Sequence, residues 1–293
     1  MKPTWSEPAQ AEPFAGRTAL ITGGTRGIGK ALAIALACRG ANVTIAAKTE
    51  KPDPRLPGTL ASALAEIEAA CGRRSALAMR TDVRDEEGVI RAIEATVSRF
   101  GGLDMVVHNA GAIHLAPTTE TPLKRFDLLM SVNLRAFYAL IYHALIPLTK
   151  GTNPHILAFA PPLPAEPALL APHVAYSISK FGISIGVLGF AEELRSRSIA
   201  VNGLWPCTFI DTTAIRNLLG GAPAASRSRS PEIVVDAALA LLAAPSREMS
   251  GGLWTDEQVL QRFGVSDFTQ YSTCPVTNLL PDLFLTRKGT TGR

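Results

Sequence analysis

Short apolar runs rich in β-branched residues alternate with longer helix-like stretches along most of this chain. Such runs are typical of buried parallel strands, and the stretches between them are typical of covering helices. The expected strands cover residues 19–22, 42–46, 76–80, 105–108, 156–159, 200–204 and 252–254. The expected helices cover residues 27–39, 59–70, 86–100, 122–148 with a break, 175–197 and 231–243. The alternation predicts an α/β fold with one doubly wound parallel sheet of about seven strands flanked by helices.

The length of 293 residues favours one large domain with short extensions. We expect a flexible leader over residues 1–16, the domain over residues 17–255, and a C-terminal extension over residues 256–293 that packs on the domain.

Proline and glycine clusters predict loops at residues 52–57, 161–167 and 220–230, and the serine/arginine run 226–230 is expected to be solvated. The last two loops follow the fifth and sixth strands. Ligands of open parallel sheets bind at the carboxyl ends of the strands, so these loops should form the walls of a substrate pocket. The apolar side chains there favour an apolar ligand; they are Leu163, Leu169, Leu170, Phe209, Ile215, Leu218 and Leu219.

Composition narrows the class of protein. With 47% hydrophobic and 18% charged residues the chain is globular, and a net charge of +4 without a basic stripe argues against nucleic acid. The four cysteines are widely spaced, which suggests neither a metal site nor a disulfide framework and favours a cytoplasmic setting. No uninterrupted apolar run reaches the roughly 18 residues of a membrane span.

A glycine-rich turn directly follows the first expected strand and opens a helix. Glycines at this place let the backbone approach a pyrophosphate, whose charge is met by the N–H groups of the helix end. This context points to a dinucleotide site. Its expected contacts are Gly23, Thr25, Arg26, Gly27, Ile28 and Gly29.

The pattern Thr-Gly-x-x-x-Gly-x-Gly resembles the cofactor loop of the short-chain dehydrogenase/reductase family, which has a Rossmann-like fold. Later motifs in matching order strengthen the resemblance, in particular to the short-chain domain of type-2 hydroxysteroid dehydrogenase-like proteins. The resemblance implies that Asp82 and Val83 hold the adenine ring and that the turn after the fourth strand lines the cofactor. This turn contains Asn109, Ala110 and Gly111.

A tyrosine and a lysine four residues apart share one face of an expected helix. The Lys180 ammonium should favour the ionised form of the Tyr176 phenol and lower its pKa, which suits proton transfer to a carbonyl that takes up hydride. The family resemblance further implies that Lys180 holds the nicotinamide ribose and that Asn133 positions a water in a proton relay.

The family's catalytic serine after the fifth strand has no counterpart, and Ala160 stands in its place in our alignment. Three accounts remain open. In the first, another side chain, such as Ser177, His173 or Thr208, donates the hydrogen bond to the substrate carbonyl. In the second, the chain is a slow or specialised enzyme that needs no such donor. In the third, it is a catalytically impaired NADP(H)-binding regulatory or scaffold protein.

Charge at the end of the second strand favours NADP(H). No carboxylate precedes Glu50, whereas Lys48 and Arg26 could both face a 2′-phosphate. After the sixth strand, the family resemblance implies that Pro206 and Thr212 lie beside the nicotinamide carboxamide. The sequence therefore predicts an NADP(H)-dependent oxidoreductase acting on a carbonyl or alcohol.

Two long helices are apolar on more faces than one covered side requires, around residues 134–148 and 178–194. Gly182, Gly186 and Gly189 would permit close helix pairing between subunits. We expect a homo-oligomer, a dimer or a tetramer.

Overall fold

The computed structural model describes residues 13–54, 56–72, 75–272 and 274–286. They form one seven-stranded sheet with the order β3-β2-β1-β4-β5-β6-β7, in which every neighbouring pair is parallel. The strands are β1 (Thr18–Thr22), β2 (Asn42–Ala47), β3 (Ala76–Arg80), β4 (Met105–His108), β5 (His155–Phe159), β6 (Ala200–Trp205) and β7 (Leu253–Thr255). The predicted doubly wound α/β fold is confirmed.

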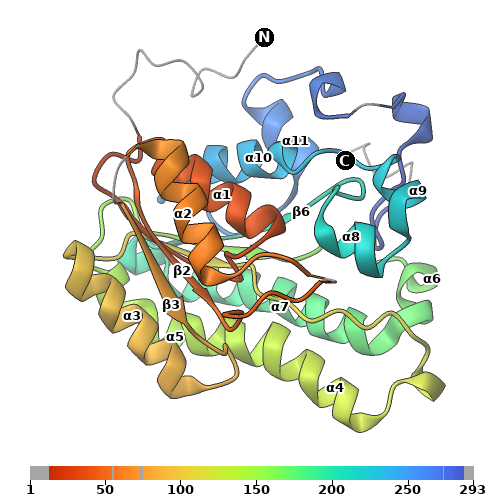
Figure 1. Ribbon diagram of the computed structural model, residues 1–293, viewed down its shortest axis with the longest axis horizontal. Coiled ribbons are helices and arrows are strands. Elements are labelled where there is room, and N and C mark those ends of the chain that lie inside the picture. The colour runs from red at the N-terminus through yellow and green to blue at the C-terminus, as the bar shows by residue number, and fades with distance from the viewer. Residues whose placement is uncertain (1–12, 55, 73–74, 273, 287–293) are drawn as a thin grey trace.

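Helices cover both faces of the sheet (Figure 1). One layer contains α1 (Gly27–Ala37), α2 (Leu60–Cys71), α10 (Glu232–Ala243) and α11 (Asp256–Arg262). The other contains α3 (Glu86–Phe100), α4 (Leu123–Leu129), α5 (Ala136–Leu148) and α7 (Val174–Glu193). Shorter helices α6 (Pro167–Leu170), α8 (Thr213–Leu218) and α9 (Gly221–Ala225) lie beyond the carboxyl ends of β5 and β6. Each face of the sheet has its own apolar core, so the inner strands β1, β4, β5 and β6 are buried on both sides, whereas the edge strand β3 is not.

The break expected within residues 122–148 is a π-helical turn, Met130–Arg135, between α4 and α5. Its only fully enclosed side chain is Asn133. A π turn inserts one residue into the helix and often marks a functional site. Here the turn directs the Asn133 amide toward α7, where its Nδ2 donates to Ser179 Oγ at 2.9 Å.

Three local predictions were wrong. The last part of the expected leader is folded, because Phe14 is buried and the Arg17 guanidinium lies over its ring; residues 1–12 lie outside the described part. Residues 221–225 form helix α9 rather than a loop. Arg229, expected to be solvated, is 2% exposed and forms an ion pair with Glu257.

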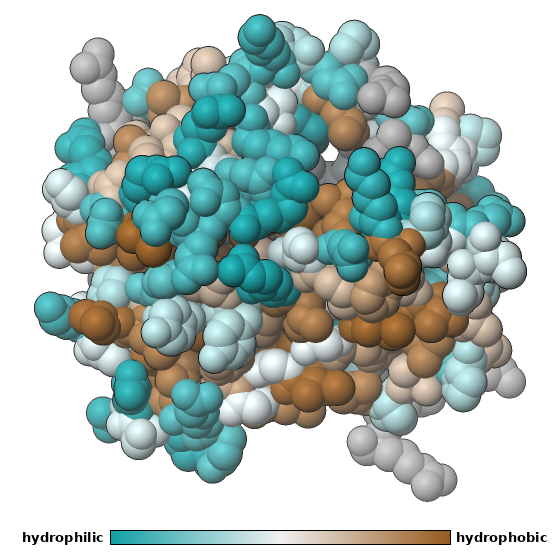
Figure 2. Space-filling model, turned by 90° about the horizontal axis from the view of Figure 1, so that it is seen from below, coloured by the Kyte–Doolittle hydropathy of each residue, from teal (hydrophilic) through white to brown (hydrophobic). Residues whose placement is uncertain are grey.

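Helix α7 crosses α5 closely within one chain. A Cβ added at Gly182 would lie 2.9 Å from Leu134, and one at Gly186 would lie 2.9 Å from Phe137. These two glycines therefore permit packing inside the subunit, where we had expected them to serve pairing between subunits. Apolar side chains nevertheless remain exposed on α5 and α7, among them Ile146, Ile185 and Leu188, and Figure 2 shows hydrophobic side chains gathered across the lower face of the molecule.

By mean hydropathy and length alone, the continuous helical stretches Leu123–Leu148 and Pro167–Glu193 would suffice to cross a membrane. Charged and polar residues interrupt both stretches, so neither forms an uninterrupted apolar run. In the most apolar 18-residue part of each stretch, 44% and 50% of the residues are buried inside this fold. Core helices of an α/β fold have this character.

Candidate active site

The glycine turn after β1 is shaped by a side chain from the neighbouring strand. Asn109, at the end of β4, donates from Nδ2 to the carbonyl oxygens of Thr22 and Gly23. A Cβ at Gly29 would lie 2.3 Å from that amide nitrogen, and Gly23 has a φ of 72°. Only glycine fits both positions. Position 29 must leave room for the Asn109 amide, and position 23 adopts a left-handed backbone conformation.

The same turn leaves a cradle at the N-terminus of α1. Gly24 faces Ile45 so closely that an added Cβ would lie 2.6 Å away. Thr25 is buried, Ile28 packs against the core, and Gly27 faces the Thr212 methyl group. A Cβ at any of these glycines would narrow the turn. The backbone is therefore open to a pyrophosphate where the helix dipole is positive.

Two cations lie at the end of β2. The Arg26 guanidinium reaches across from the glycine turn and donates to Thr49 Oγ1 at 3.1 Å and to the Gly58 carbonyl at 3.0 Å. Its Nε is buried and has no hydrogen-bond partner among the described residues. Lys48 is exposed beside it, close enough to help lower the pKa of Asp82. An anionic group placed here would meet two positive charges, of which Arg26 also lies within the field of the Asp53 carboxylate.

The remaining expected cofactor residues lie along the same carboxyl edge. Val83 is buried after β3, whereas the Asp82 carboxylate is held by Arg84, whose hydrogen bonds lower the pKa of Asp82 to about 2. Pro206 follows β6 and is buried. Ala110 donates its N–H to Thr22 Oγ1, and the Thr212 side chain caps the N-terminus of α8. Gly111 faces Asn133, because a Cβ added at Gly111 would lie 3.6 Å from Asn133 Oδ1.

Tyr176, Lys180 and Asn133 meet where α7 crosses the π turn. Tyr176 and Lys180 are 4% and 8% exposed, and Asn133 has no exposed surface. Lys180 Nζ donates to the Phe159 carbonyl at 2.9 Å and lies 5.3 Å from the centre of the Trp205 ring. The backbone carbonyl of Asn133, the residue expected to position a water in a proton relay, is in contact with His108 Nε2 at 2.8 Å. The relay itself stays a prediction.

Burial governs the ionisation of these groups. It lowers the pKa of Lys180 to about 8, although the Asp282 carboxylate acts in the opposite direction. Burial also raises the pKa of Tyr176 far above its usual value, and the negative charge of Asp282 adds to this effect. The expected lowering by Lys180 is therefore wrong for this state of the protein, because the phenol is enclosed and the ammonium is directed to the Phe159 carbonyl.

The family model that describes short chain dehydrogenases matches residues 17–219, which include the glycine turn, the π turn and the Tyr176–Lys180 pair. The chain belongs to the short-chain dehydrogenase family. It is similar to hydroxysteroid dehydrogenase-like protein 2 of Danio rerio, with 48% identity over 93% of this chain and 64% of the relative. The human protein of that name is 46% identical, with the same coverage of both chains. The chain thus spans somewhat less than two thirds of these curated relatives.

Solved short-chain dehydrogenases share the fold. One from Mycobacterium thermoresistibile has a TM-score of 0.87 and 42% identity, covering 95% of this chain and 99% of its own. One from Burkholderia cenocepacia, solved in complex with NADP, has a TM-score of 0.69 and 29% identity, covering 83% and 97%. A third, from Mycobacterium paratuberculosis, is bound to NAD; its 22% identity and TM-score of 0.70, over 85% and 99%, show the shared fold alone.

The segment after β5 offers no hydroxyl group to a short-chain dehydrogenase site. No serine or threonine occurs between Thr152 and Ser177. The Ala160 methyl group is fully buried, and a Cβ added at Gly203 would lie 3.3 Å from it. Position 160 therefore packs into the core between β5 and β6, so a serine there would be enclosed as well.

The C-terminal segment packs against Tyr176, a contact that the sequence did not reveal. The Phe284 ring stacks on Tyr176, with centroids 5.9 Å apart, and also touches Phe181 and Trp205. Trp205 Nε1 donates to Asp282 Oδ1 at 2.7 Å, which fixes the segment to the end of β6. Of the pocket residues expected from the sequence, Leu170 packs in this cluster, whereas Phe209, Ile215 and Leu219 pack in a separate one. Leu163 is 43% exposed, and the side chain of Leu218 lies outside the description.

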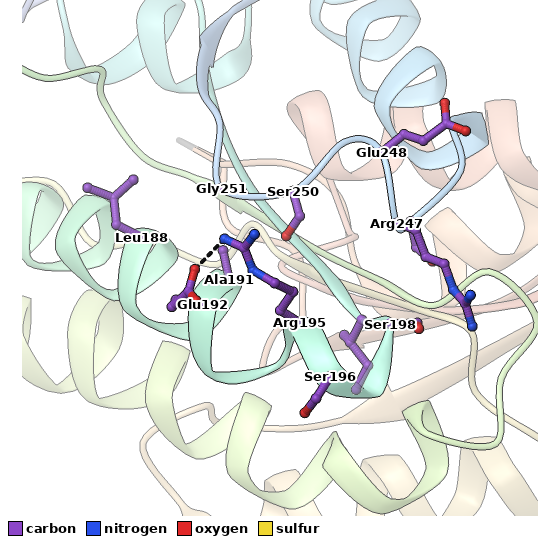
Figure 3. Close-up of a pocket in the computed structure, with 12 residues that line it drawn as sticks. Leu188, Ala191, Glu192, Arg195, Ser196, Ser198, Arg247, Glu248, Ser250 and Gly251 are labelled. Atoms are coloured by element: carbon purple, nitrogen blue, oxygen red, sulfur yellow. Dashed lines mark hydrogen bonds and ion pairs between the residues drawn. The ribbon is translucent and has the colours of Figure 1, made fainter.

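A hollow of about 760 Å³ lies at the other end of α7 and is not this site (Figure 3). Leu188, Glu192 and Arg195 line it from the helix end, and Ser250 and Gly251 line it from the loop before β7. At 1.5 Å per residue, the sixteen residues from Tyr176 to Glu192 place it about 24 Å from Tyr176. It opens at the amino edge of the sheet, where open α/β folds do not bind their ligands.

Proposed function

We propose that this protein is an NADP(H)-dependent oxidoreductase that interconverts a carbonyl and an alcohol on an apolar substrate. The Tyr176–Lys180 pair at the carboxyl edge of the sheet, next to the glycine cradle, carries the proposal. The family membership supports oxidoreductase chemistry. The partly buried apolar side chains around Tyr176, which include Leu115, Met130 and Leu170, support an apolar substrate.

The residues at the edge of the sheet fit a nicotinamide dinucleotide. The cradle from Gly23 to Gly29 would hold its pyrophosphate, and Arg26 with Lys48 would hold a 2′-phosphate. Arg26 Nε is a buried donor without a partner among the described residues. When bound, the nicotinamide supplies or accepts a hydride. The protein itself must then provide the proton and hold the reacting oxygen.

Tyr176 handles the proton in this scheme. Its neutral phenol donates from Oη to the oxygen of a carbonyl that is being reduced, and takes the proton back during alcohol oxidation. The Lys180 ammonium, which donates to the Phe159 carbonyl in this structure, would stabilise the phenolate that forms if it turned toward it, because an opposite charge within a few ångströms favours the ionised state. Lys180 also keeps the end of β5 in place through the Phe159 carbonyl.

A panel of ketones and aldehydes, assayed by NADPH oxidation, tests the proposal with the full chain. Tyr176→Phe is the matched control because it removes one hydroxyl and leaves the ring contact with Phe284. We expect turnover by the wild type, a loss of about 10²-fold or more in the variant, and similar NADPH affinity in both. Equal rates in the two proteins would contradict the role of Tyr176.

A second candidate function is cofactor binding without turnover. Its support is specific: the segment after β5 has no hydroxyl, and Phe284 covers Tyr176. NADPH binding without oxidation of NADPH across the whole panel would favour this candidate.

We further propose a homo-oligomeric assembly in a cytoplasmic, reducing setting. The exposed apolar side chains of α5 and α7 support the first part. The cysteines support the second, since Cys38, Cys71, Cys207 and Cys274 form no disulfide within the described residues.

A further inference from the structure

Reduction of a carbonyl places negative charge on its oxygen, and that charge is stabilised by preorganised hydrogen-bond donors. Tyr176 is one such donor. The segment after β5 offers no second one, because no serine or threonine occurs between Thr152 and Ser177 and because Pro161 and Pro162 have no N–H. A second donor must come from elsewhere in the site.

Two of the candidate side chains are poorly placed. Ser177 Oγ donates to the carbonyl oxygens of Leu170 and His173, so its proton is already used within the helix start. Thr208 Oγ1 is buried without a partner among the described residues, but Thr208 forms a β-bridge with Pro281, and the structure gives it no ring or hydrogen-bond contact with Tyr176.

His173 is placed differently. It is the residue directly before α7, three positions ahead of Tyr176. Their ring centroids are 6.0 Å apart. His173 is 6% exposed, and its Nε2 is buried without a hydrogen-bond partner in the described part of the chain. A buried nitrogen in that condition destabilises the fold unless a ligand satisfies it.

The Phe284 ring touches both side chains. Its centroid lies 5.9 Å from that of Tyr176 and 5.4 Å from that of His173. A group that replaced this ring would therefore face the phenol and the imidazole together. Burial lowers the pKa of His173, so the ring is neutral at physiological pH and carries a single N–H, which can reside on Nε2.

We propose that His173 donates a hydrogen bond from Nε2–H to the substrate carbonyl oxygen, in the space that Phe284 fills in this structure. The inference rests on the proposed oxidoreductase function and names the donor that replaces a loop serine. As the carbonyl carbon accepts hydride, the π electron pair moves to the oxygen. The Tyr176 O–H bond breaks and the product O–H bond forms, while the His173 N–H bond stays intact.

Two variants of the full chain separate this role from a structural one. His173→Phe keeps an aromatic ring and removes the N–H, whereas His173→Gln keeps a donor. With a carbonyl compound that the wild type reduces, we expect His173→Phe to lower kcat/KM by about 10²- to 10³-fold. His173→Gln should recover at least a tenth of the wild-type value, and Thr208→Val should change it little. NADPH affinity should be the same in all four proteins.

A binding measurement keeps the test independent of turnover. Benzamide, whose carbonyl accepts a hydrogen bond and is not reduced, is titrated into each protein saturated with NADPH. We expect weaker binding to His173→Phe than to His173→Gln and the wild type. Wild-type turnover that His173→Phe retains in full overturns the inference alone. Absence of turnover with equal benzamide affinities overturns both the inference and the proposed function.

Discussion

Phe284 lies flat against Tyr176, with ring planes inclined by 13° and centroids 5.9 Å apart. One residue near the described C-terminus thus shields the hydroxyl-bearing ring on which the proposed chemistry depends. Movement of the Phe284 ring would widen the access of a substrate carbonyl to Tyr176. The enclosure also explains why the pKa of the phenol is raised rather than lowered.

Phe284→Ala should open the site. We expect a several-fold rise in kcat/KM for bulky apolar carbonyls, since the ring no longer competes with substrate for its place. The variant should also lose about 3 kcal/mol of unfolding free energy, because truncating a buried phenylalanine leaves a cavity. Steady-state kinetics and urea unfolding measure the two effects.

The control for Phe284→Ala is Val276→Ala, which truncates a side chain of the same C-terminal region that is 59% exposed. It should change neither quantity appreciably. A fall in kcat/KM of Phe284→Ala with every substrate would show that Phe284 assists binding instead of blocking it.

Arg26→Ala should weaken NADPH binding about 10-fold or more and leave NADH binding nearly unchanged, because a charge-assisted hydrogen bond contributes about 1.5–3 kcal/mol. Lys48→Ala should act in the same direction with a smaller effect, since Lys48 is exposed. Lys51→Ala, at another exposed lysine nearby, is the control. Fluorescence titration with both nucleotides measures the preference, and equal wild-type affinities would rule out the NADP(H) assignment.

Asp282→Asn should stabilise the protein in a pH-dependent way. Burial raises the pKa of Asp282 from 3.8 to about 7 in the folded state. Between these values the unfolded chain releases a proton that the folded chain keeps, so stability falls as pH rises through this window. Above pH 7 the folded protein bears the full cost of the carboxylate.

The neutral amide removes that cost, and its oxygen can still accept from Trp205 Nε1. One pKa unit corresponds to about 1.4 kcal/mol, so we expect the variant to be more stable by about 1–3 kcal/mol at pH 8 and by little at pH 4. Urea unfolding at the two pH values measures this, with Asp127→Asn, at an exposed carboxylate, as the control. A gain of equal size at both pH values would contradict the assignment to Asp282.

The exposed face of α5 and α7 should form a contact between subunits. Ile146 and Ile185 are 71% and 66% exposed, and their replacement by aspartate should dissociate an assembly that is held by apolar burial. Light scattering at micromolar concentration should give a multiple of 31.0 kDa for the wild type and about one chain mass for the double variant. Leu123→Asp, 78% exposed on α4, is the control. A wild-type mass of one chain would refute the oligomer.

Local signals in the sequence were enough for the sheet and the cofactor edge. Each strand is a short, largely apolar run, and Gly23, Gly29 and Asn109 lie at fixed offsets from strand ends. Their mutual contact follows once β1 and β4 are neighbours. The Tyr176–Lys180 spacing sets a common helix face, and it needs no knowledge of the tertiary structure.

The features that the sequence did not predict depend on contacts between residues that lie far apart along the chain. Phe284 and Asp282 lie more than one hundred residues from Tyr176, and no periodic pattern brings them to it. Arg229 appeared solvated because its neighbours are polar, yet Glu257 on α11 supplies a buried partner. The same holds for the pKa of Tyr176. Whether this pKa is raised or lowered depends on the residues that bury the phenol, and the spacing of residues along a helix does not predict them.

The chain leaves the described fold at residue 286, two positions after the ring that shields Tyr176. A group attached near residue 286 by a short flexible linker would be held close to the proposed active site, at an effective concentration in the millimolar range. A C-terminal affinity tag would then act as a built-in competitor for the substrate. The start of β1 lies at the opposite edge of the sheet, so an N-terminal tag leaves kinetic measurements undisturbed.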